Sequence, residues 1–499
     1  MSTIRRQSII SSVLTYTGFA LGFVNTWILA RNFSPEDYGL ISIFTSIANI
    51  MCAIAYLGMP SYIYKFFPYY KDNLPPRKND MLAWVLLTAL IGFAGVTILG
   101  WLCKDLVIRQ FAAHSAELVK YYQWVFVFGL GMTFYTLLEM YAWQLKRSIL
   151  TNYLKEIQFR AFTTLLIILF LTGILPGFDA FIRFYAFTYL LLALVLVAAL
   201  IKAKEFYLVF TPSRVTRKFL SKIKSLVILT WSGSLILTVS NFFAAIVIAA
   251  VVPGGMAAVA VYNLATFIGS LLQAPQRTIV SASINPLSLA WKDKDYAKIN
   301  RIYHRSSINQ LIFSVGVFIL AWINFTDGVR TFHFQPIYMQ CRPVFFFVGL
   351  KLIVDMGTGV NAQIIATSTF WRFDFFSGLV LVTLTLPLNY FLAKEQGPVG
   401  PALADLITFT IYNAIRYIFL YRKFRMQPFT LKSLYTLLLA AAGYGVCHLW
   451  LTGIHGLIGM TLRSIVFLAI YGTGILTLKL SDDIIPVWNT IRKRLGLSR

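Results

Sequence analysis

The chain has 499 residues, of which 58% are hydrophobic, and its mean hydropathy is +0.71. This composition is too apolar for a soluble globular domain or a disordered chain, and it indicates a membrane protein. The formal net charge is +25, but no soluble stretch interleaves basic with aromatic residues, which argues against nucleic-acid binding.

Fourteen apolar stretches follow one another along the chain. Each has about the 17–25 residues that a helix needs to cross a bilayer. They lie at 8–29, 39–60, 82–102, 119–143, 157–175, 180–201, 226–249, 256–275, 308–325, 342–367, 374–392, 401–421, 434–451 and 460–480. The first could be a signal peptide, but it lacks a small-residue cleavage site, so we expect it in the mature protein. The sequence predicts an all-α polytopic membrane protein with 14 transmembrane helices.

The loops between these stretches are alternately rich and poor in basic residues. Most of the 44 Lys and Arg residues lie in every second loop and in the two tails. The positive-inside rule makes those loops and both termini cytoplasmic, where the basic residues also attract anionic lipid head groups. We therefore expect a multi-pass membrane protein with both termini in the cytoplasm. The outer loops and helix ends hold a smaller set: Arg31, Lys104, Arg109, Lys120, Arg183, Arg330, Arg342, Lys394 and Arg463.

The chain also carries signs of an internal duplication. Pro35 and Pro253 are 218 residues apart, and Pro68 and Pro286 have the same separation. A shift across six helices preserves orientation, so we expect two parallel six-helix lobes and a cleft between them that opens alternately to either side. The predicted organisation is an N-terminal lobe at 1–201, a cytoplasmic linker at 202–225, a C-terminal lobe at 226–421, and two further helices with a basic cytoplasmic tail at 422–499.

Charged residues inside the apolar stretches mark a candidate substrate path, because a charge at mid-membrane costs about 2.5–3.5 kcal/mol on insertion scales. Lys351 and Asp355 are four residues apart and therefore share one helix face. Glu139 lies on the corresponding helix of the other lobe under the shift of 218 residues. We expect all three to line the central cleft. The alternative is that Lys351 and Asp355 neutralise each other as a structural pair.

Other cations lie at the ends of the predicted helices. Arg31 lies at the outer end of the first helix, and Lys65 and Arg277 lie at the inner ends of the second and eighth. These three are candidates for contact with an anionic substrate, and the alternative is that they snorkel to lipid head groups. Arg416 and Arg463 are also near helix ends, and for them we expect snorkelling only.

A region near the N-terminus resembles a known family. Residues 30–39 read ARNFSPEDYG and resemble the first outer loop of the polysaccharide-biosynthesis flippases, whose pattern is roughly A-R-x-L-x-P-x-x-Y/F-G. Residues 57–70, LGMPSYIYKFFPYY, are similar to the end of the second helix in oligosaccharide (O-antigen type) flippases. The fourteen-helix layout also matches this family, which belongs to the multidrug/oligosaccharidyl-lipid/polysaccharide exporter superfamily.

The resemblance implies a flippase and not an enzyme. Its substrate would be an oligosaccharide on polyprenyl diphosphate, moved by alternating access from the cytoplasmic to the outer leaflet of a bacterial inner (plasma) membrane. The moved units would serve surface polysaccharide or lipopolysaccharide assembly. The implied partners are membrane lipids and the polysaccharide polymerase and glycosyltransferases of the same pathway. We expect no cofactor or metal, since the four cysteines and five histidines are scattered and no Walker motif is present.

Three other functions remain as alternatives. A cation-coupled multidrug and toxin exporter typically carries an acid in its first or seventh helix, and neither stretch here contains Asp or Glu. A lipid II flippase has the same architecture, and only the motif at 57–70 favours oligosaccharides over it. A membrane enzyme would need paired carboxylates in a sizeable outer loop, and the outer loops at 103–118 and 326–341 offer none at catalytic spacing.

Overall fold

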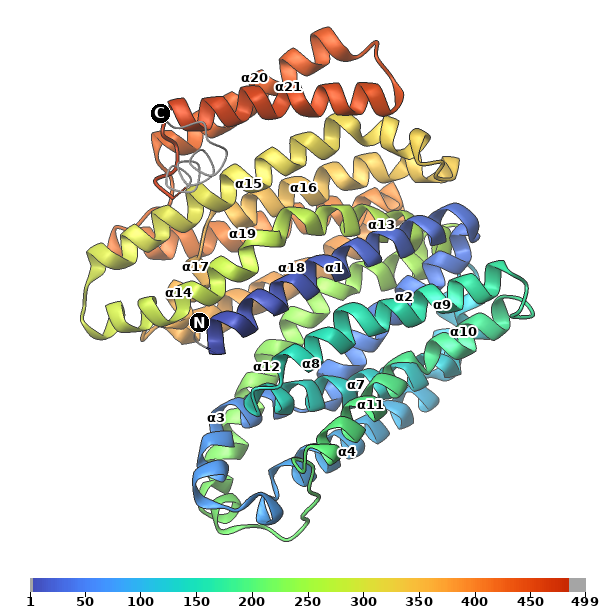
Figure 1. The fold of residues 1–499 in the computed structure, drawn as a ribbon, viewed down its shortest axis with the longest axis vertical. Helices are drawn as coiled ribbons and strands as arrows, with labels where there is room; N and C mark the ends of the chain where they lie inside the picture. Colours follow the sequence, from blue (N-terminus) through green and yellow to red (C-terminus); the bar gives the residue numbers. More distant parts are fainter. Residues whose placement is uncertain (1–2, 484–499) are drawn as a thin grey trace. The chain divides into compact units, whose positions relative to one another are not determined.

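The computed structural model describes residues 3–483, and in that range it contains helices, turns and loops but no strand. It divides into two compact units, residues 1–260 and 261–499, whose helices are coloured from blue to red in Figure 1. The basic tail predicted at the C-terminus lies largely in residues 484–499, outside the described part.

The first unit begins with α1 and ends inside α13. Its helices are α1 (Thr3–Asn32), α2 (Pro35–Ala55), α3 (Met59–Asn73), α4 (Met81–Leu102), α5 (Lys104–Phe111), α6 (Ala116–Lys120), α7 (Tyr122–Gln144), α8 (Ser148–Asn152), α9 (Phe159–Leu171), α10 (Phe178–Ala186), α11 (Thr188–Lys202), α12 (Arg214–Val251) and α13 (Gly255–Ser270). Within this unit α2 contacts α4, α7 and α12, while α1 packs on α8 and α9. The linker predicted at 202–225 is partly helical, because α12 already begins at Arg214 and packs against α2 and α3.

The second unit contains the rest of the chain. Its helices are α14 (Ala274–Lys292), α15 (Tyr296–Thr331), α16 (Cys341–Gly357), α17 (Asn361–Ala366), α18 (Trp371–Gln396), α19 (Val399–Phe424), α20 (Leu431–Leu451) and α21 (Gly456–Thr477). Helix α16 contacts both α15 and α19, and α18 packs along α19. The last two helices, α20 and α21, pack on each other and on α15, as Figure 1 shows.

Thirteen spans in residues 3–483 are long and apolar enough to cross a membrane. The all-α polytopic class is confirmed, and the count of 14 is not. The stretch predicted at 157–175 is the one without a matching span. There α9 has only 13 residues, and the preceding turn, Tyr153–Gln158, is π-helical and carries Lys155 and Glu156.

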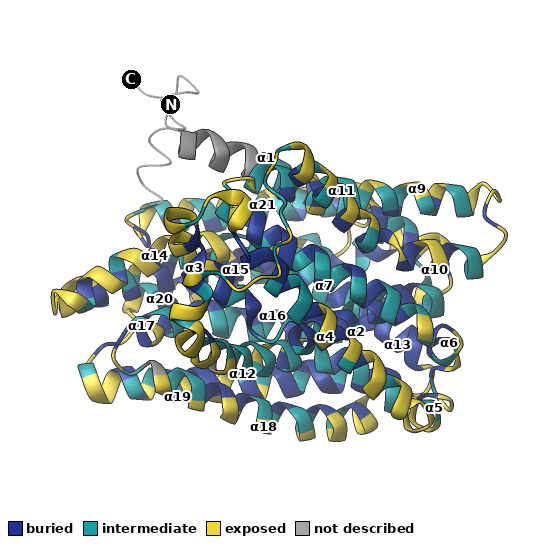
Figure 2. Cartoon of the chain, turned by 90° about the horizontal axis from the view of Figure 1, so that it is seen from below, coloured by how far each residue is buried: buried dark blue, intermediate teal, exposed yellow. Residues whose placement is uncertain are grey.

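Burial separates interior helices from those that face outward. In α2 and α7, 67% and 61% of the most apolar window is buried, against 22% in α20 and 28% in α21. Figure 2 shows the same contrast, with dark blue positions along α2, α7 and α16 and many yellow positions along α18. Exposed apolar side chains on such long apolar helices are expected to face lipid, where they need no protein partner.

The family-like stretch folds as an interhelical turn followed by two helices. Ser34 caps α2, since its hydroxyl accepts a hydrogen bond from the amide of Asp37 at 3.1 Å, and Pro35 opens the helix. Helix α2 ends where Leu57 and Gly58 adopt positive φ values of 44° and 74°. Pro68 lies inside α3 and Pro286 inside α14, so both prolines of the second matched pair lie within helices.

Glycines allow helices of the first unit to approach closely. A Cβ atom at Gly131 of α7 would lie 2.4 Å from the backbone nitrogen of Leu190 in α11, and one at Gly92 of α4 would lie 2.1 Å from the carbonyl oxygen of Ala55. Helix association in lipid depends on such contacts because it lacks the hydrophobic driving force available in water.

We expect Gly131→Ala to destabilise the protein by about 1–3 kcal/mol, because the added methyl group overpacks the α7–α11 contact. The matched control is Gly95→Ala in α4, where an added Cβ meets nothing within 4 Å. That substitution should be neutral or stabilising by up to about 1 kcal/mol, since alanine favours a helix over glycine. Thermal unfolding of the purified protein in detergent measures both, and equal melting temperatures for the two variants would contradict the packing argument.

Candidate functional site

A buried ion pair joins two helices of the second unit. Lys351 Nζ of α16 lies 2.8 Å from Asp405 Oδ2 of α19, and their side chains are only 14% and 4% exposed. The ammonium group of Lys351 also lies 4.0 Å from the centroid of the Phe409 ring, which favours a cation–π contact. Asn389 Nδ2 of α18 donates a hydrogen bond of 3.5 Å to the other carboxylate oxygen of Asp405, Oδ1.

The alternative considered for Lys351, a structural pair with Asp355, is not what the structure contains. The lysine is paired with Asp405 and not with Asp355, although Asp355 lies one helical turn away. Asp355 instead accepts hydrogen bonds from two amides, Gln276 Nε2 at 3.0 Å and Asn413 Nδ2 at 3.1 Å. The i,i+4 spacing makes a pair possible, but a carboxylate on the facing helix is available to the lysine.

Asp355 belongs to a network of polar side chains from four helices. The side-chain oxygen of Asn413 in α19 accepts hydrogen bonds from Oγ1 of Thr358, the residue that follows α16, and from Asn361 Nδ2 of α17, both at 2.9 Å. Asn361 and Asn413 are buried, and the contact of Gln276 with Asp355 adds α14. Such interhelical hydrogen bonds contribute about 0.6–2 kcal/mol each in a membrane, so the network fixes the position of Asp355 among these helices.

Glu139 occupies a comparable position in the first unit. This acid of α7 is buried, and Lys155 Nζ lies 3.1 Å from its Oε2 atom. Lys155 lies in the π-helical turn before α9 and is 46% exposed at its side chain. The first unit thus holds a buried acid on α7 and the second a partly buried acid on α16, each with polar partners. Their predicted position along a central cleft stays a prediction.

The three helix-end cations lie on exposed surface. Arg31, Lys65 and Arg277 are all exposed, in α1, α3 and α14. The guanidinium carbon of Arg31 lies 5.5 Å from the centre of the Trp27 ring. Their exposure fits both contact with substrate phosphates and contact with lipid head groups.

The expectation that Arg416 and Arg463 only snorkel is wrong. Arg416 is 5% exposed and forms an ion pair with Asp374 of α18. Arg463 is 4% exposed and pairs with Asp327 of α15, linking α21 to the bundle. Both arginines reach inward because a carboxylate on a facing helix is available as an ion-pair partner.

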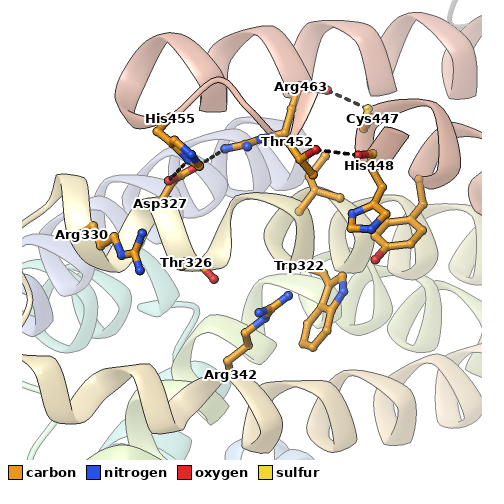
Figure 3. Close-up of a pocket in the computed structure, with 12 residues that line it drawn as sticks. Trp322, Thr326, Asp327, Arg330, Arg342, Cys447, His448, Thr452, His455 and Arg463 are labelled. Atoms are coloured by element: carbon orange, nitrogen blue, oxygen red, sulfur yellow. Dashed lines mark hydrogen bonds and ion pairs between the residues drawn. The ribbon is translucent and has the colours of Figure 1, made fainter. Parts of the chain in front are cut away.

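Near Arg463 the second unit contains a pocket of about 170 Å³. It is lined by the end of α15, the start of α16, and the end of α20 with the start of α21. The lining residues that Figure 3 labels are Trp322, Thr326, Asp327, Arg330, Arg342, Cys447, His448, Thr452, His455 and Arg463. None of the described residues forms a cluster of His, Cys, Asp or Glu that could hold a metal ion.

The opposite end of α15 carries a second polar cluster. Arg305 pairs with Asp483, and Asn309 Nδ2 lies 2.7 Å from the same carboxylate. The hydrogen bond and charge of Arg305 lower the pKa of Asp483. This cluster ties the segment after α21 to α15.

The sequence analysis did not single out several acidic residues that the structure pairs with these cations or with polar groups. Asp405 lies well inside the stretch predicted at 401–421, so the argument that singled out Glu139 and Asp355 applies to it equally. Asp374 and Asp327 lie at the edges of their predicted stretches, where acids are common. Asp80, at 0% exposure, accepts hydrogen bonds from Ser213 N at 2.9 Å and Thr216 Oγ1 at 2.6 Å at the start of α12, and its sequence context gives no signal for that contact.

Comparisons with solved structures place the fold among membrane transporters. The lipid II flippase MurJ, in an inward closed conformation, is similar with a TM-score of 0.73 and 17% identity over 94% of this chain and 99% of that one. An inward-facing multidrug resistance MATE family transporter of the MOP superfamily is similar with a TM-score of 0.62 and 15% identity, over 82% of this chain and 96% of that one. A MOP superfamily transporter from Pyrococcus furiosus has a TM-score of 0.55 and 14% identity, over 83% of this chain and 94% of that one. At these identities the likeness concerns the fold.

Among curated proteins, none matches the sequence. A family model described as "Polysaccharide biosynthesis protein" matches residues 4–290, more than half of the 499-residue chain. The matched region contains the turn at residues 30–39 and the two helices that follow it. The chain therefore belongs to the polysaccharide biosynthesis protein family, with the polytopic fold of MurJ and MATE transporters.

Proposed function

We propose that this protein is a flippase for oligosaccharide units linked to polyprenyl diphosphate, and that it moves them from the cytoplasmic to the outer leaflet of a bacterial inner membrane. The observation that carries the proposal is the family match over residues 4–290 on a chain that has a flippase-like fold along 94% of its length. The moved units would serve the assembly of a surface polysaccharide or lipopolysaccharide. The pathway's polymerase and glycosyltransferases are the proposed partners.

The negatively charged diphosphate of such a substrate is a candidate ligand for the Lys351 ammonium group. A diphosphate is an anion, and the only carboxylate recorded within ion-pair distance of Lys351 among the described residues is Asp405. An arriving diphosphate would compete with Asp405 for the ammonium group, while the amides around Asp355 keep that second acid in place. Exchange of Lys351 between the two anions would couple substrate arrival to a change in the α16–α19 contact.

The multidrug exporter is a weaker candidate on this chain. In this chain, neither α1 nor the seventh predicted span, which lies within α12, contains Asp or Glu. Both helices therefore lack a carboxylate that could bind a coupling cation. A lipid II flippase stays a second candidate because the MurJ fold covers nearly the whole chain. The two flippase candidates differ in head group, which an assay with both lipids can separate.

The purified protein in proteoliposomes should transfer a fluorescent polyprenyl-diphosphate oligosaccharide between leaflets, measured as the fraction that becomes accessible to a membrane-impermeant quencher. Protein-free vesicles give the background rate. Lipid II and a cationic drug are the comparison substrates. Transfer of lipid II alone, or uptake of the drug alone, would contradict the proposed cargo.

The Lys351–Asp405 pair can be tested separately from folding. Lys351→Met or Asp405→Leu alone should destabilise the protein by about 3–5 kcal/mol, because each leaves a buried charge without its partner. The double variant should recover most of that stability, since an apolar pair of similar volume replaces an ion pair at little cost. We expect the double variant to be folded but to transfer the oligosaccharide lipid at least tenfold more slowly. Normal transfer by a stable double variant would make the pair structural only.

The orientation can be tested with a natural probe. Of the four cysteines, Cys103 is exposed, and Cys52, Cys341 and Cys447 are buried. Cys103 lies between α4 and α5, in a loop that the charge distribution places outside. A membrane-impermeant maleimide should therefore label the protein in intact spheroplasts, and Cys103→Ser should abolish labelling. Labelling only after the spheroplasts are lysed would reverse the proposed orientation.

A further inference from the structure

Two aromatic rings of the first unit lie together on its exposed surface. Tyr64 of α3 and Trp143 of α7 have ring centroids 6.4 Å apart and ring planes that differ by only 15°. The two residues are 42% and 38% exposed. Under the predicted topology they lie toward the cytoplasmic side, where α7 ends. Exposed aromatic residues at helix ends commonly contact the lipid interface, so the pair faces either lipid or a polar space.

The charges beside the two rings argue against a lipid-facing surface. Glu139 lies one helical turn before Trp143 and shares its face of α7, and Lys155 Nζ lies 3.1 Å from the Glu139 carboxylate. Burial and the nearby charge of Glu139 raise the pKa of Tyr64 to about 12, so the acid lies close to this ring as well. Charged groups inside a span face a cavity or a polar partner rather than hydrocarbon. The surface that carries both rings therefore faces a polar space.

The protein itself holds the indole ring in place. Trp143 Nε1 donates a hydrogen bond of 2.8 Å to Thr151 Oγ1, and the Thr151 hydroxyl donates at 3.1 Å to the carbonyl oxygen of Ser148. In an interfacial belt the indole N–H would instead point to water or lipid head groups. A ring that is already oriented loses little conformational freedom when a ligand packs on it.

These groups together have the composition of a carbohydrate site. A sugar ring has a face of C–H bonds that packs on the negatively polarised face of an aromatic ring. Its hydroxyl groups need hydrogen-bond donors and acceptors. Lys155 can supply a donor, because an ammonium group has three and the two oxygens of Glu139 accept at most two of them. The protonated Tyr64 hydroxyl can donate or accept.

We propose that Tyr64 and Trp143 stack on the sugar of the substrate at the cytoplasmic side, and that Lys155 donates a hydrogen bond to a sugar hydroxyl. This inference rests on the proposed function, since it assigns the site to the oligosaccharide of the transported lipid. The site distinguishes the glycosylated lipid from the same polyprenyl diphosphate without sugar, which a cation that binds the diphosphate does not do.

The test compares wild type with Tyr64→Leu, Trp143→Leu, Tyr64→Phe and Trp101→Leu, each as full-length protein in nanodiscs of neutral phosphatidylcholine. Trp101 is the matched control, because it is a 73% exposed aromatic residue of α4 in the same unit. The probes are polyprenyl diphosphate that carries a hexose oligosaccharide and polyprenyl diphosphate without sugar. Binding is measured by native mass spectrometry, and thermal unfolding verifies that each variant is folded.

We expect wild type and Trp101→Leu to bind the glycosylated lipid equally, and more tightly than the sugar-free lipid. Tyr64→Leu and Trp143→Leu should each bind the glycosylated lipid about three- to tenfold more weakly, the range for one lost aromatic contact. Their affinity for the sugar-free lipid should not change. Tyr64→Phe keeps the ring and should bind the glycosylated lipid more tightly than Tyr64→Leu does.

Three results would contradict the proposal. Equal weakening for both lipids would overturn the sugar assignment, because the rings would then contact the part that the two lipids share. Equal affinities of Tyr64→Phe and Tyr64→Leu would overturn stacking on the tyrosine ring. Unchanged binding of the glycosylated lipid by both folded leucine variants would overturn the site.

The leaflet-transfer assay separates this inference from the proposed function. If wild type transfers the oligosaccharide lipid but the leucine variants bind it normally, the sugar site fails and the flippase proposal stands. If wild type transfers none of the substrates but the leucine variants lose sugar-dependent binding, the site stands and the proposed function fails.

Discussion

The constraint on which this structure depends is that a charge buried in a membrane protein needs a partner. Four charge pairs in the described residues satisfy it: Lys351 with Asp405, Arg416 with Asp374, Arg463 with Asp327, and Lys155 with Glu139. Each pair joins different helices or turns, so each also determines which elements pack together. Removing one member leaves the other unpaired in a low-dielectric interior, which costs more than the pair itself contributes.

The same constraint separates structural charges from candidate functional ones. Arg416 and Arg463 are almost fully buried and have carboxylate partners, so the fold itself accounts for them. Arg330 and Arg342 are exposed into a pocket and have no such partner in the described part of the chain. Lys351 lies between these cases, since it is paired but keeps partial exposure. An anionic lipid substrate would act most directly on the exposed Arg330 and Arg342 and on the partly exposed Lys351.

Much of the architecture was predictable from the sequence. Long apolar stretches determine membrane spans because every backbone polar group must be satisfied inside the helix, and 13 of the predicted stretches have matching spans. The stretch at 157–175 was harder, because a π-helical turn with charged residues interrupts it. The turn at Ser34 and Pro35 was also predictable, since capping and proline placement are local effects. The family match at residues 4–290 agrees with the resemblance read from that turn.

The sequence by itself determined the all-α membrane class, most span positions, the family, and the presence of charges within the spans. The tertiary structure decided how those charges pair. Asp405 is 54 residues from Lys351, and Asp327 is 136 residues from Arg463, so neither pair follows from helical periodicity, which relates only residues one or two turns apart. Spans are local in sequence because each helix satisfies its own backbone, whereas ion pairs and pockets depend on which helices become neighbours.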